Sequence, residues 1–244
     1  MSDAGERAIL FPSYQWNPYQ RLLAEYVTES GFEAEAVHEW PKRAPLLGTW
    51  LRQGRPQVMH IHWIQEFLGG SKGKPTDRNV RWFDWQLRTL KRAGVRIVWT
   101  VHNLKGHAAK GQDANDVAAH KIMIEHADAI ILHCDYARDA LIDLYQPSAE
   151  ARARMHVLLH GSYVRQYDVD LEQEAARRAL GLTDVGTVFA FVGSIRGYKN
   201  VGELLDAFMR VEELSPDDRL FIAGRPYPPK FGRKLEKLAS EDKR

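Results

Sequence analysis

Histidines fall at the ends of four apolar segments of this 244-residue sequence. The segment VMHIHW carries His60 and His62, and the segments WTVH, ILHC and LLHG carry His102, His133 and His160. If these segments are parallel strands, their carboxyl ends gather at one edge of a sheet, so we expect the histidines to lie close together. Neutral imidazoles can bind zinc or another divalent ion, or can pack and hydrogen-bond within the sheet. No carboxylates accompany the histidines at a diagnostic spacing, so we expect no metal and keep a histidine-rich metal hydrolase only as a weaker alternative.

A second candidate site lies in the stretch AFVGSIRGYKNVGELLDAF, residues 190–208. Gly193 lets the backbone approach a ligand, Arg196 supplies a planar guanidinium and Lys199 supplies a mobile point charge. The helix expected to begin near residue 200 presents unpaired N–H groups, which attract phosphate. The pattern fits a diphosphate site, and a surface turn with solvated cations fits the local sequence equally well.

The first apolar segment leads into SYQWNPYQRLL rather than into a glycine-rich turn. The sequence contains no G-x-G-x-x-G fingerprint, so a nicotinamide enzyme is disfavoured. Asn17 and Pro18 suit the start of a helix. Tyr14, Gln15 and Asn17 would also lie at the mouth of the sheet, where a substrate can rest, and the sequence leaves the two interpretations balanced.

These residues need a scaffold of alternating strands and helices, and the hydrophobic pattern supplies it. We predict strands over residues 8–12, 33–37, 57–63, 95–102, 128–134, 155–160, 187–193 and 219–224. Helices are predicted over residues 18–30, 44–53, 79–93, 114–126, 136–145, 171–180, 201–213 and 230–240. The fold class is therefore α/β, with a doubly wound parallel sheet. We expect an N-terminal domain over residues 1–165, a linker with a helix over 166–186, and a partial second domain over 187–244.

Composition limits the partners and the compartment. The net charge of +2 gives no argument for nucleic-acid binding, and the single cysteine, Cys134, excludes an internal disulfide. The sequence has no secretory signal pattern and no apolar run of membrane-spanning length, so a cytoplasmic protein is expected, with the inner face of the membrane left open.

One segment is locally basic. Between Ser71 and Arg96, eight Lys or Arg residues stand against only Asp77 and Asp84. Trp82 and Trp85 lie in the same segment. Aromatic residues among cations suit a membrane surface or a lipid-linked acceptor, whereas packing of one helix face on the sheet is the more common use of such residues.

Taken together, the motifs resemble those of GT-B glycosyltransferases of the family 4 type, also called glycosyl transferases group 1. FVGSIRGYKNVGELLDAF with RLFIAG resembles the start of their C-terminal domain, and VMHIHW, VWTVHN, HADAIILHCDYARDAL and MHVLLHGSYV follow the order of their N-terminal segments. The resemblance implies two Rossmann-like domains and transfer of a hexose from a UDP- or GDP-sugar to a saccharide or lipid-linked acceptor. Retention of configuration and no metal or other cofactor are also implied.

The resemblance also implies roles for particular residues. Arg196 and Lys199, with Gly193 and Ser194, would bind the donor diphosphate, and His102 would lie beside the transferred sugar. The residues assigned to substrate binding are Tyr14, Gln15, Asn17, His62 and Asn103.

Two departures from the family pattern matter. Ser194 stands where the family commonly has arginine, so Arg196 is expected either to approach the phosphates from a different angle or to substitute only partly for that arginine. The glutamate-bearing segment that would hold the rest of the donor has no counterpart, so we expect a truncated C-terminal domain. The alternative function is a catalytically silent module that binds sugar nucleotides.

Overall fold

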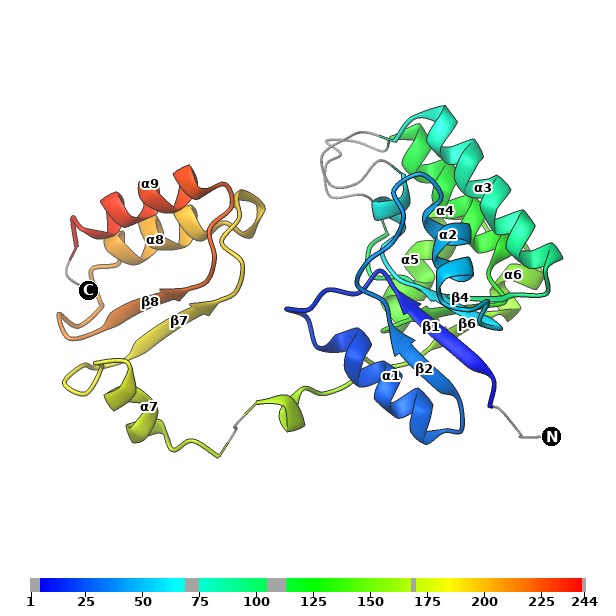
Figure 1. Cartoon of the computed structure of the whole chain (residues 1–244). Helices are drawn as coiled ribbons and strands as arrows, with labels where there is room; N and C mark the ends of the chain where they lie inside the picture. The colour runs from blue at the N-terminus through cyan, green and yellow to red at the C-terminus, as the bar shows by residue number, and fades with distance from the viewer. Residues whose placement is uncertain (1–4, 69–74, 105–112, 168–169, 243–244) are drawn as a thin grey trace. The chain divides into compact units, whose positions relative to one another are not determined.

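The computed structural model describes residues 5–68, 75–104, 113–167 and 170–242. The chain divides into two compact units, Met1–Tyr167 and Asp168–Arg244, which are described separately (Figure 1). Lys72, Lys74 and most of the loop after Asn103, which the sequence analysis singled out, lie outside the described residues.

The first unit is built on a six-stranded parallel sheet with the order β2-β1-β3-β4-β5-β6. Its strands are β1 (Arg7–Phe11), β2 (Glu33–Ala36), β3 (Val58–Ile61), β4 (Arg96–Thr100), β5 (Ala129–Leu132) and β6 (Met155–Val157). The strand order reverses between β1 and β3, and ligands of such sheets bind beside the carboxyl ends of the strands at that point. The predicted α/β class with a doubly wound parallel sheet is confirmed.

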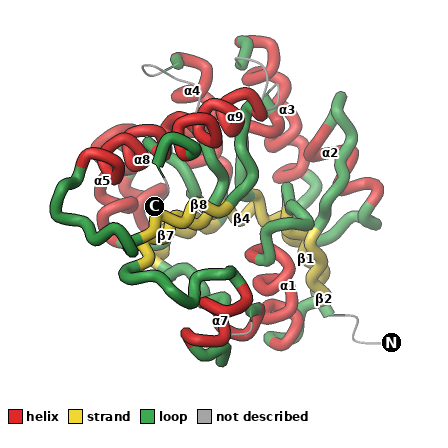
Figure 2. The backbone as a smooth tube through the Cα atoms, turned by 90° about the vertical axis from the view of Figure 1, so that its left-hand side faces the viewer, coloured by secondary structure: helices red, strands yellow, loops and turns green. Residues whose placement is uncertain are grey.

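Helices cover the two faces of this sheet unequally. The helices of the unit are α1 (Tyr19–Glu29), α2 (Pro45–Arg52), α3 (Asp77–Arg92), α4 (Ala114–His126), α5 (Asp135–Tyr145) and α6 (Ala149–Ala153), with 3-10 turns η1 (Ile64–Phe67) and η2 (Val164–Gln166). Helix α1 lies on one face, and α2, α3 and α4 lie on the opposite face (Figures 1 and 2). Right-handed crossovers produce this arrangement, because the chain moves one way along the sheet after β1 and the other way after β2.

The core of the first unit lies between the sheet and helices α2 to α5. Ile9 and Phe11 of β1, Met59 of β3 and Trp99 of β4 are at most 1% exposed and belong to one continuous cluster. Burial of such large apolar side chains is the main force that holds the sheet together. Within the described ranges, every helix is too short or too polar to cross a bilayer.

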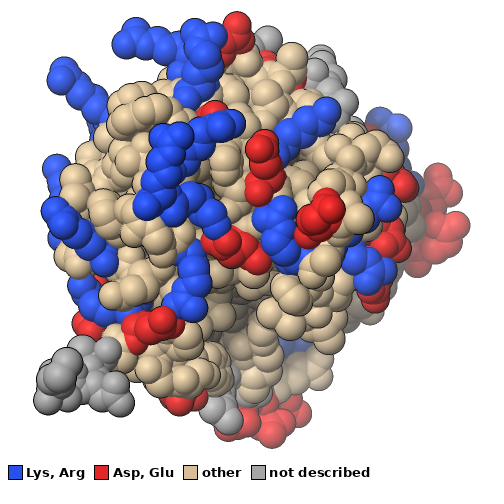
Figure 3. Space-filling model, turned by 90° about the vertical axis from the view of Figure 1, so that its right-hand side faces the viewer, with Lys and Arg blue, Asp and Glu red and all other residues tan. Residues whose placement is uncertain are grey.

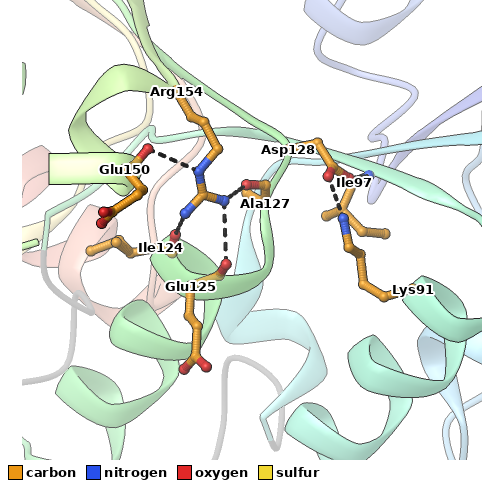
Figure 4. A network of polar contacts seen from close by, with 8 residues as sticks. All are labelled: Lys91, Ile97, Ile124, Glu125, Ala127, Asp128, Glu150 and Arg154. Carbon is orange, nitrogen blue, oxygen red and sulfur yellow. Dashed lines mark hydrogen bonds and ion pairs between the residues drawn. The ribbon is translucent and has the colours of Figure 1, made fainter. Parts of the chain in front are cut away.

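The junction between α4 and β5 is fixed by two charged side chains (Figure 4). The guanidinium of Arg154 donates to the backbone oxygens of Ile124, Glu125 and Ala127 at the end of α4. The carboxylate of Asp128 accepts a bond from the backbone N–H of Ile97 at 2.8 Å and pairs with Lys91. These contacts hold β4 and β5 in register, and both strands lead to the histidines.

The second unit contains a two-stranded parallel sheet, β7 (Val188–Val192) and β8 (Arg219–Ala223). Its helices are α7 (Gln173–Ala179), α8 (Val201–Arg210) and α9 (Pro229–Ala239), with a 3-10 turn, η3 (Gly197–Lys199). Helices α8 and α9 pack against each other (Figure 1), and they share a small core with the sheet: Ile195, Val201, Leu205 and Leu235. The unit therefore buries far fewer apolar side chains than the first one.

Candidate functional site

The histidines of the first unit converge as the strand pattern predicts. His60 lies in β3 and His62 follows it, His102 follows β4, His133 follows β5, and His160 follows β6. Ring centroids lie 4.4 Å apart for His60 and His62, 5.3 Å for His62 and His102, 5.6 Å for His102 and His133, and 5.1 Å for His133 and His160. Five imidazoles thus form a continuous row along the carboxyl edge of the sheet.

Tyr19, the first residue of α1, lies against this row. Its ring centroid is 4.8 to 5.8 Å from those of four histidines, His62, His102, His133 and His160. Its hydroxyl lies 3.4 Å from Nε2 of His133. Burial raises the pKa of Tyr19 to about 12, so the phenol is neutral near pH 7. The sequence analysis did not identify Tyr19, and its only signal was an aromatic residue directly after the helix-starting Pro18.

His62 and His102 form a hydrogen-bonded pair of neutral rings. Nδ1 of His62 lies 3.0 Å from Nε2 of His102, so one nitrogen donates and the other accepts. Burial, aided by neighbouring histidines, lowers the pKa of His102 to about 3 and holds the pKa of His62 well below its usual value. His62 is only 2% exposed, so its contact is with His102 rather than with the surface. Within the described residues, Nδ1 of His102 and the buried Nε2 of His62 have no recorded hydrogen-bond partner, so both nitrogens remain for a ligand.

His60 lies within strand β3 and is also buried. Its Nε2 lies 2.8 Å from the hydroxyl of Thr100, and the residue is 7% exposed. Burial, with a contribution from His133, lowers the pKa of His60 to about 3. This ring therefore belongs to the packed, hydrogen-bonded histidines that the sequence analysis kept as one of its two alternatives.

An aromatic row extends from His102 to the outside of the unit. The ring of Trp63 stacks on His102 with centroids 4.5 Å apart, and Tyr14 lies 5.2 Å from Trp63. Trp16 stacks on Tyr14 at 5.4 Å and is 79% exposed. Burial and the nearby carboxylate of Glu66 raise the pKa of Tyr14. Trp63 and Trp16 were not among the predicted site residues.

The remaining predicted residues of this unit lie around the same rim. Gln15 is exposed, and the amide oxygen of Asn17 accepts a bond from the backbone N–H of Tyr19 at 3.1 Å. Asn17 thus helps to start α1, although Pro18 rather than Asn17 occupies the N-cap position. The backbone oxygen of Asn103 lies 3.3 Å from Nε2 of His120. A cavity of about 10 Å³ lies among His62, Trp63 and His102, and it is too small for a sugar ring.

The predicted diphosphate-binding residues are described within the second unit by themselves. Gly193 has φ of +146°, and the ammonium of Lys199 lies 3.5 Å from the position that a Cβ at Gly193 would occupy. Nε of Arg196 lies 3.2 Å from the hydroxyl of Ser194, and its guanidinium lies 5.0 Å from the ring centre of Tyr227. No carboxylate among the described residues is recorded as a partner of either cation. The turn therefore presents two uncompensated positive charges at the end of β7.

The start of α8 completes this turn. Asn200 has left-handed dihedrals, φ of 54° and ψ of 33°, and its side chain does not cap the helix. Among the described residues, no side chain is recorded as an acceptor for the first N–H groups of α8, and such unpaired donors favour an anion. Gly224 of the neighbouring strand end touches Gly193, because a Cβ there would lie 1.7 Å from the oxygen of Gly193. Position 224 therefore requires glycine for this close approach, whereas position 193 favours glycine because its φ of +146° is one that other residues rarely adopt.

The metal alternative receives no support from the described part of the chain, where no group of three or more His, Cys, Asp or Glu side chains has a geometry that could hold a metal ion.

Comparison with known proteins gives similarity to glycosyltransferases. The chain is 31% identical over 199 residues, 74% of its length, to a D-inositol 3-phosphate glycosyltransferase of Kribbella flavida, and covers 40% of that protein. It is 30% identical over 153 residues, 58% of its length, to the enzyme of the same name from Corynebacterium kroppenstedtii, and covers 33% of it. It is 26% identical over 190 residues, 78% of its length, to a GDP-mannose:glycolipid 4-beta-D-mannosyltransferase of Xanthomonas campestris, and covers 48% of it.

The chain thus spans between a third and a half of the length of these curated relatives. No protein-family model matches the sequence. The similarity supports a glycosyltransferase in general terms, and the assignment to family 4 stays a prediction.

Proposed function

We propose that this chain is a glycosyltransferase that moves a hexose from a nucleoside-diphosphate sugar to a saccharide or lipid-linked acceptor, with retention of configuration. The observation that carries the proposal is the turn after β7, where Arg196 and Lys199 follow Gly193 and neither has a recorded carboxylate partner among the described residues. Such a turn suits a diphosphate, and the similarity to glycosyltransferases supplies the reaction in which a diphosphate leaves.

Departure of the nucleoside diphosphate is the demanding step. Negative charge grows on the leaving phosphate as the bond to the sugar breaks, so Arg196, Lys199 and the start of α8 stabilise the transition state more than the bound donor. Gly193 and Ser194 allow the phosphates to approach the backbone. The acceptor hydroxyl attacks from the side of the leaving group, and its proton passes to the departing phosphate.

His102 positions the transferred sugar in this proposal. A pKa of about 3 makes its imidazole a weak base, and its Nδ1, which has no recorded partner among the described residues, can still hydrogen-bond to a sugar hydroxyl. His62 acts on the substrate through His102, because it is buried beneath it. Tyr14, Gln15, Asn17 and Asn103 form the rim that contacts substrate.

The donor nucleotide is UDP or GDP, and no metal or other cofactor is required. The Xanthomonas relative is named for GDP-mannose and a glycolipid acceptor, which favours testing GDP-mannose first.

Nucleotide release from UDP- and GDP-sugars tests the proposal. Removing one charged donor to a transition-state anion typically costs about 100-fold in rate, so Arg196→Ala and Lys199→Ala should each lower kcat/KM by about that factor. The matched control is Lys234→Ala, which removes an exposed cation of α9. Unchanged turnover in both turn variants would contradict the phosphate assignment.

Calorimetry with UDP, GDP and their sugars distinguishes the glycosyltransferase from the alternative, a silent sugar-nucleotide-binding module. Binding that Lys199→Ala weakens, without any turnover, would support a silent sugar-nucleotide-binding module. Absence of binding would contradict both functions.

A further inference from the structure

Helix α3 carries a second feature, separate from the histidine row. Its outward residues recur every three or four positions, so they lie along one side of the helix. We call these six residues the α3 outer face: Arg78, Arg81, Trp82, Trp85, Arg88 and Arg92. All six are exposed. The opposite side of the helix, with Phe83, Leu87 and Leu90, is fully buried in the core.

The two tryptophans of this face are paired with each other. Their rings stack with centroids 4.7 Å apart and planes 8° apart, and the residues remain 42% and 47% exposed. The indole N–H of Trp82 donates to the backbone oxygen of Arg43 at 2.7 Å. This bond places the exposed Lys42–Arg43 segment beside the tryptophans and adds two cations to the surface.

The cations of the face are largely free of counter-charges. Arg88 pairs with Asp84 at 2.8 Å, and Asp84 also contacts His126. No ion pair is recorded for Arg78, Arg81 or Arg92 with any described residue. The space-filling view from the side on which α3 lies shows many Lys and Arg side chains gathered on this surface (Figure 3). The net charge of the chain is only +2, so this positive surface is local.

We propose that the α3 outer face, with Lys42 and Arg43, docks on a bilayer that contains anionic phospholipids. The arginines contact lipid phosphates, and the Trp82–Trp85 pair enters the headgroup layer. Tryptophan is enriched at membrane interfaces, and each Lys or Arg near an anionic surface strengthens binding about fivefold. Charge complementarity with exposed tryptophans at the centre favours this partner over a nucleic acid, which would need extended contacts along its backbone.

Co-sedimentation of the 244-residue chain with vesicles tests this surface without any sugar donor, so its result does not depend on the proposed function. Vesicles of phosphatidylcholine with about 30% phosphatidylglycerol should bind the chain at about 0.1 M salt. Vesicles of phosphatidylcholine alone should bind little, and about 0.5 M salt should release the chain because exposed charges are then screened.

Variants assign the binding to the face. Arg78→Glu with Arg81→Glu should weaken the partition onto anionic vesicles by at least about 25-fold, and Trp85→Ala should weaken it even at low salt. The matched controls are Arg233→Glu with Lys234→Glu on α9, and Trp16→Ala at a more exposed tryptophan. Circular dichroism melting verifies that each variant folds.

Three outcomes would overturn the proposal: no binding to anionic vesicles, equal losses in the control variants, or a concentration-dependent dimer that the tryptophan variant abolishes while lipid binding is absent. Tighter binding to single-stranded DNA than to anionic vesicles would also overturn it, by indicating a nucleic-acid surface.

Discussion

The chemistry of single residues in the first unit depends on histidines that stay neutral. His60, His62 and His102 are neighbours in the row, and each has a pKa lowered mainly by burial. A charged imidazole at one of these three positions would lose its hydration, and positive charge on neighbouring rings would repel it. These three rings therefore offer hydrogen bonds rather than positive charge.

This neutrality makes stability depend on pH. His60 has a pKa of about 3 in the folded chain, against about 6.5 when unfolded, so the unfolded state takes up protons that the folded state does not. Stability is full above about pH 6.5 and falls as the pH drops towards 3, by about 2 kcal/mol at pH 5 for His60 alone. Urea unfolding at pH 7.5 and pH 5 measures this loss.

Replacing His60 tests whether this residue causes the loss of stability at low pH. His60→Gln keeps a partner for Thr100 but has no proton to gain, so the loss between the two pH values should shrink by about 2 kcal/mol. The matched control, His38→Gln, changes an exposed histidine and should retain the pH dependence of the parent. An unchanged loss in His60→Gln would contradict the assignment.

The convergence of the histidines could be predicted because parallel strands bring their carboxyl ends to one edge. The sequence could not predict that Tyr19 would lie against four of these rings, because that contact depends on how α1 packs after the β1 loop. The sequence pattern also could not predict that His62 would be buried. Alternation along the strand put His60 and His62 on one face but did not determine what covers them.

At the scale of elements, short apolar runs identified the central strands β1, β3, β4 and β5, because buried strands of a parallel sheet are nearly continuous in apolar residues. The edge strand β2, with the sequence EAEA, was also predicted although its glutamates are exposed. Most predicted boundaries differ from the observed ones by one or two residues, and two differ by three. Strand β6 ends at Val157 rather than at residue 160, so His160 stands in the following loop, and α8 ends at Arg210 rather than at residue 213. Helix α6 was missed because its five residues are too few for a periodic signal.

One arginine holds several of these elements together, and its loss should be costly. Arg154→Met should lower the free energy of unfolding by about 2 kcal/mol, because the last backbone oxygens of α4 lose their donor. Chemical denaturation followed by circular dichroism measures the change. Lys121→Met, at an exposed cation of the same helix, is the control and should change stability little. Equal losses of stability in the two variants would show that the bonds from Arg154 to the end of α4 contribute nothing specific.

At the scale of the whole molecule, the two units differ greatly in core size. All seven tryptophans precede residue 100, so tryptophan fluorescence follows only the first unit, whereas circular dichroism follows both. The small core of the second unit should unfold at lower denaturant concentration than the first. The two signals should therefore give different midpoints. Coincident curves would contradict independent units.

The order of strands in the first unit bears on how the chain assembles during synthesis. From β3 onwards each strand pairs with a neighbour already present on the N-terminal side of the sequence: β3 with β1, β4 with β3, β5 with β4 and β6 with β5. The sheet can therefore grow outward one strand at a time as the ribosome delivers it. Each loop that carries a histidine is then added to the carboxyl edge of the sheet after the preceding strands have paired.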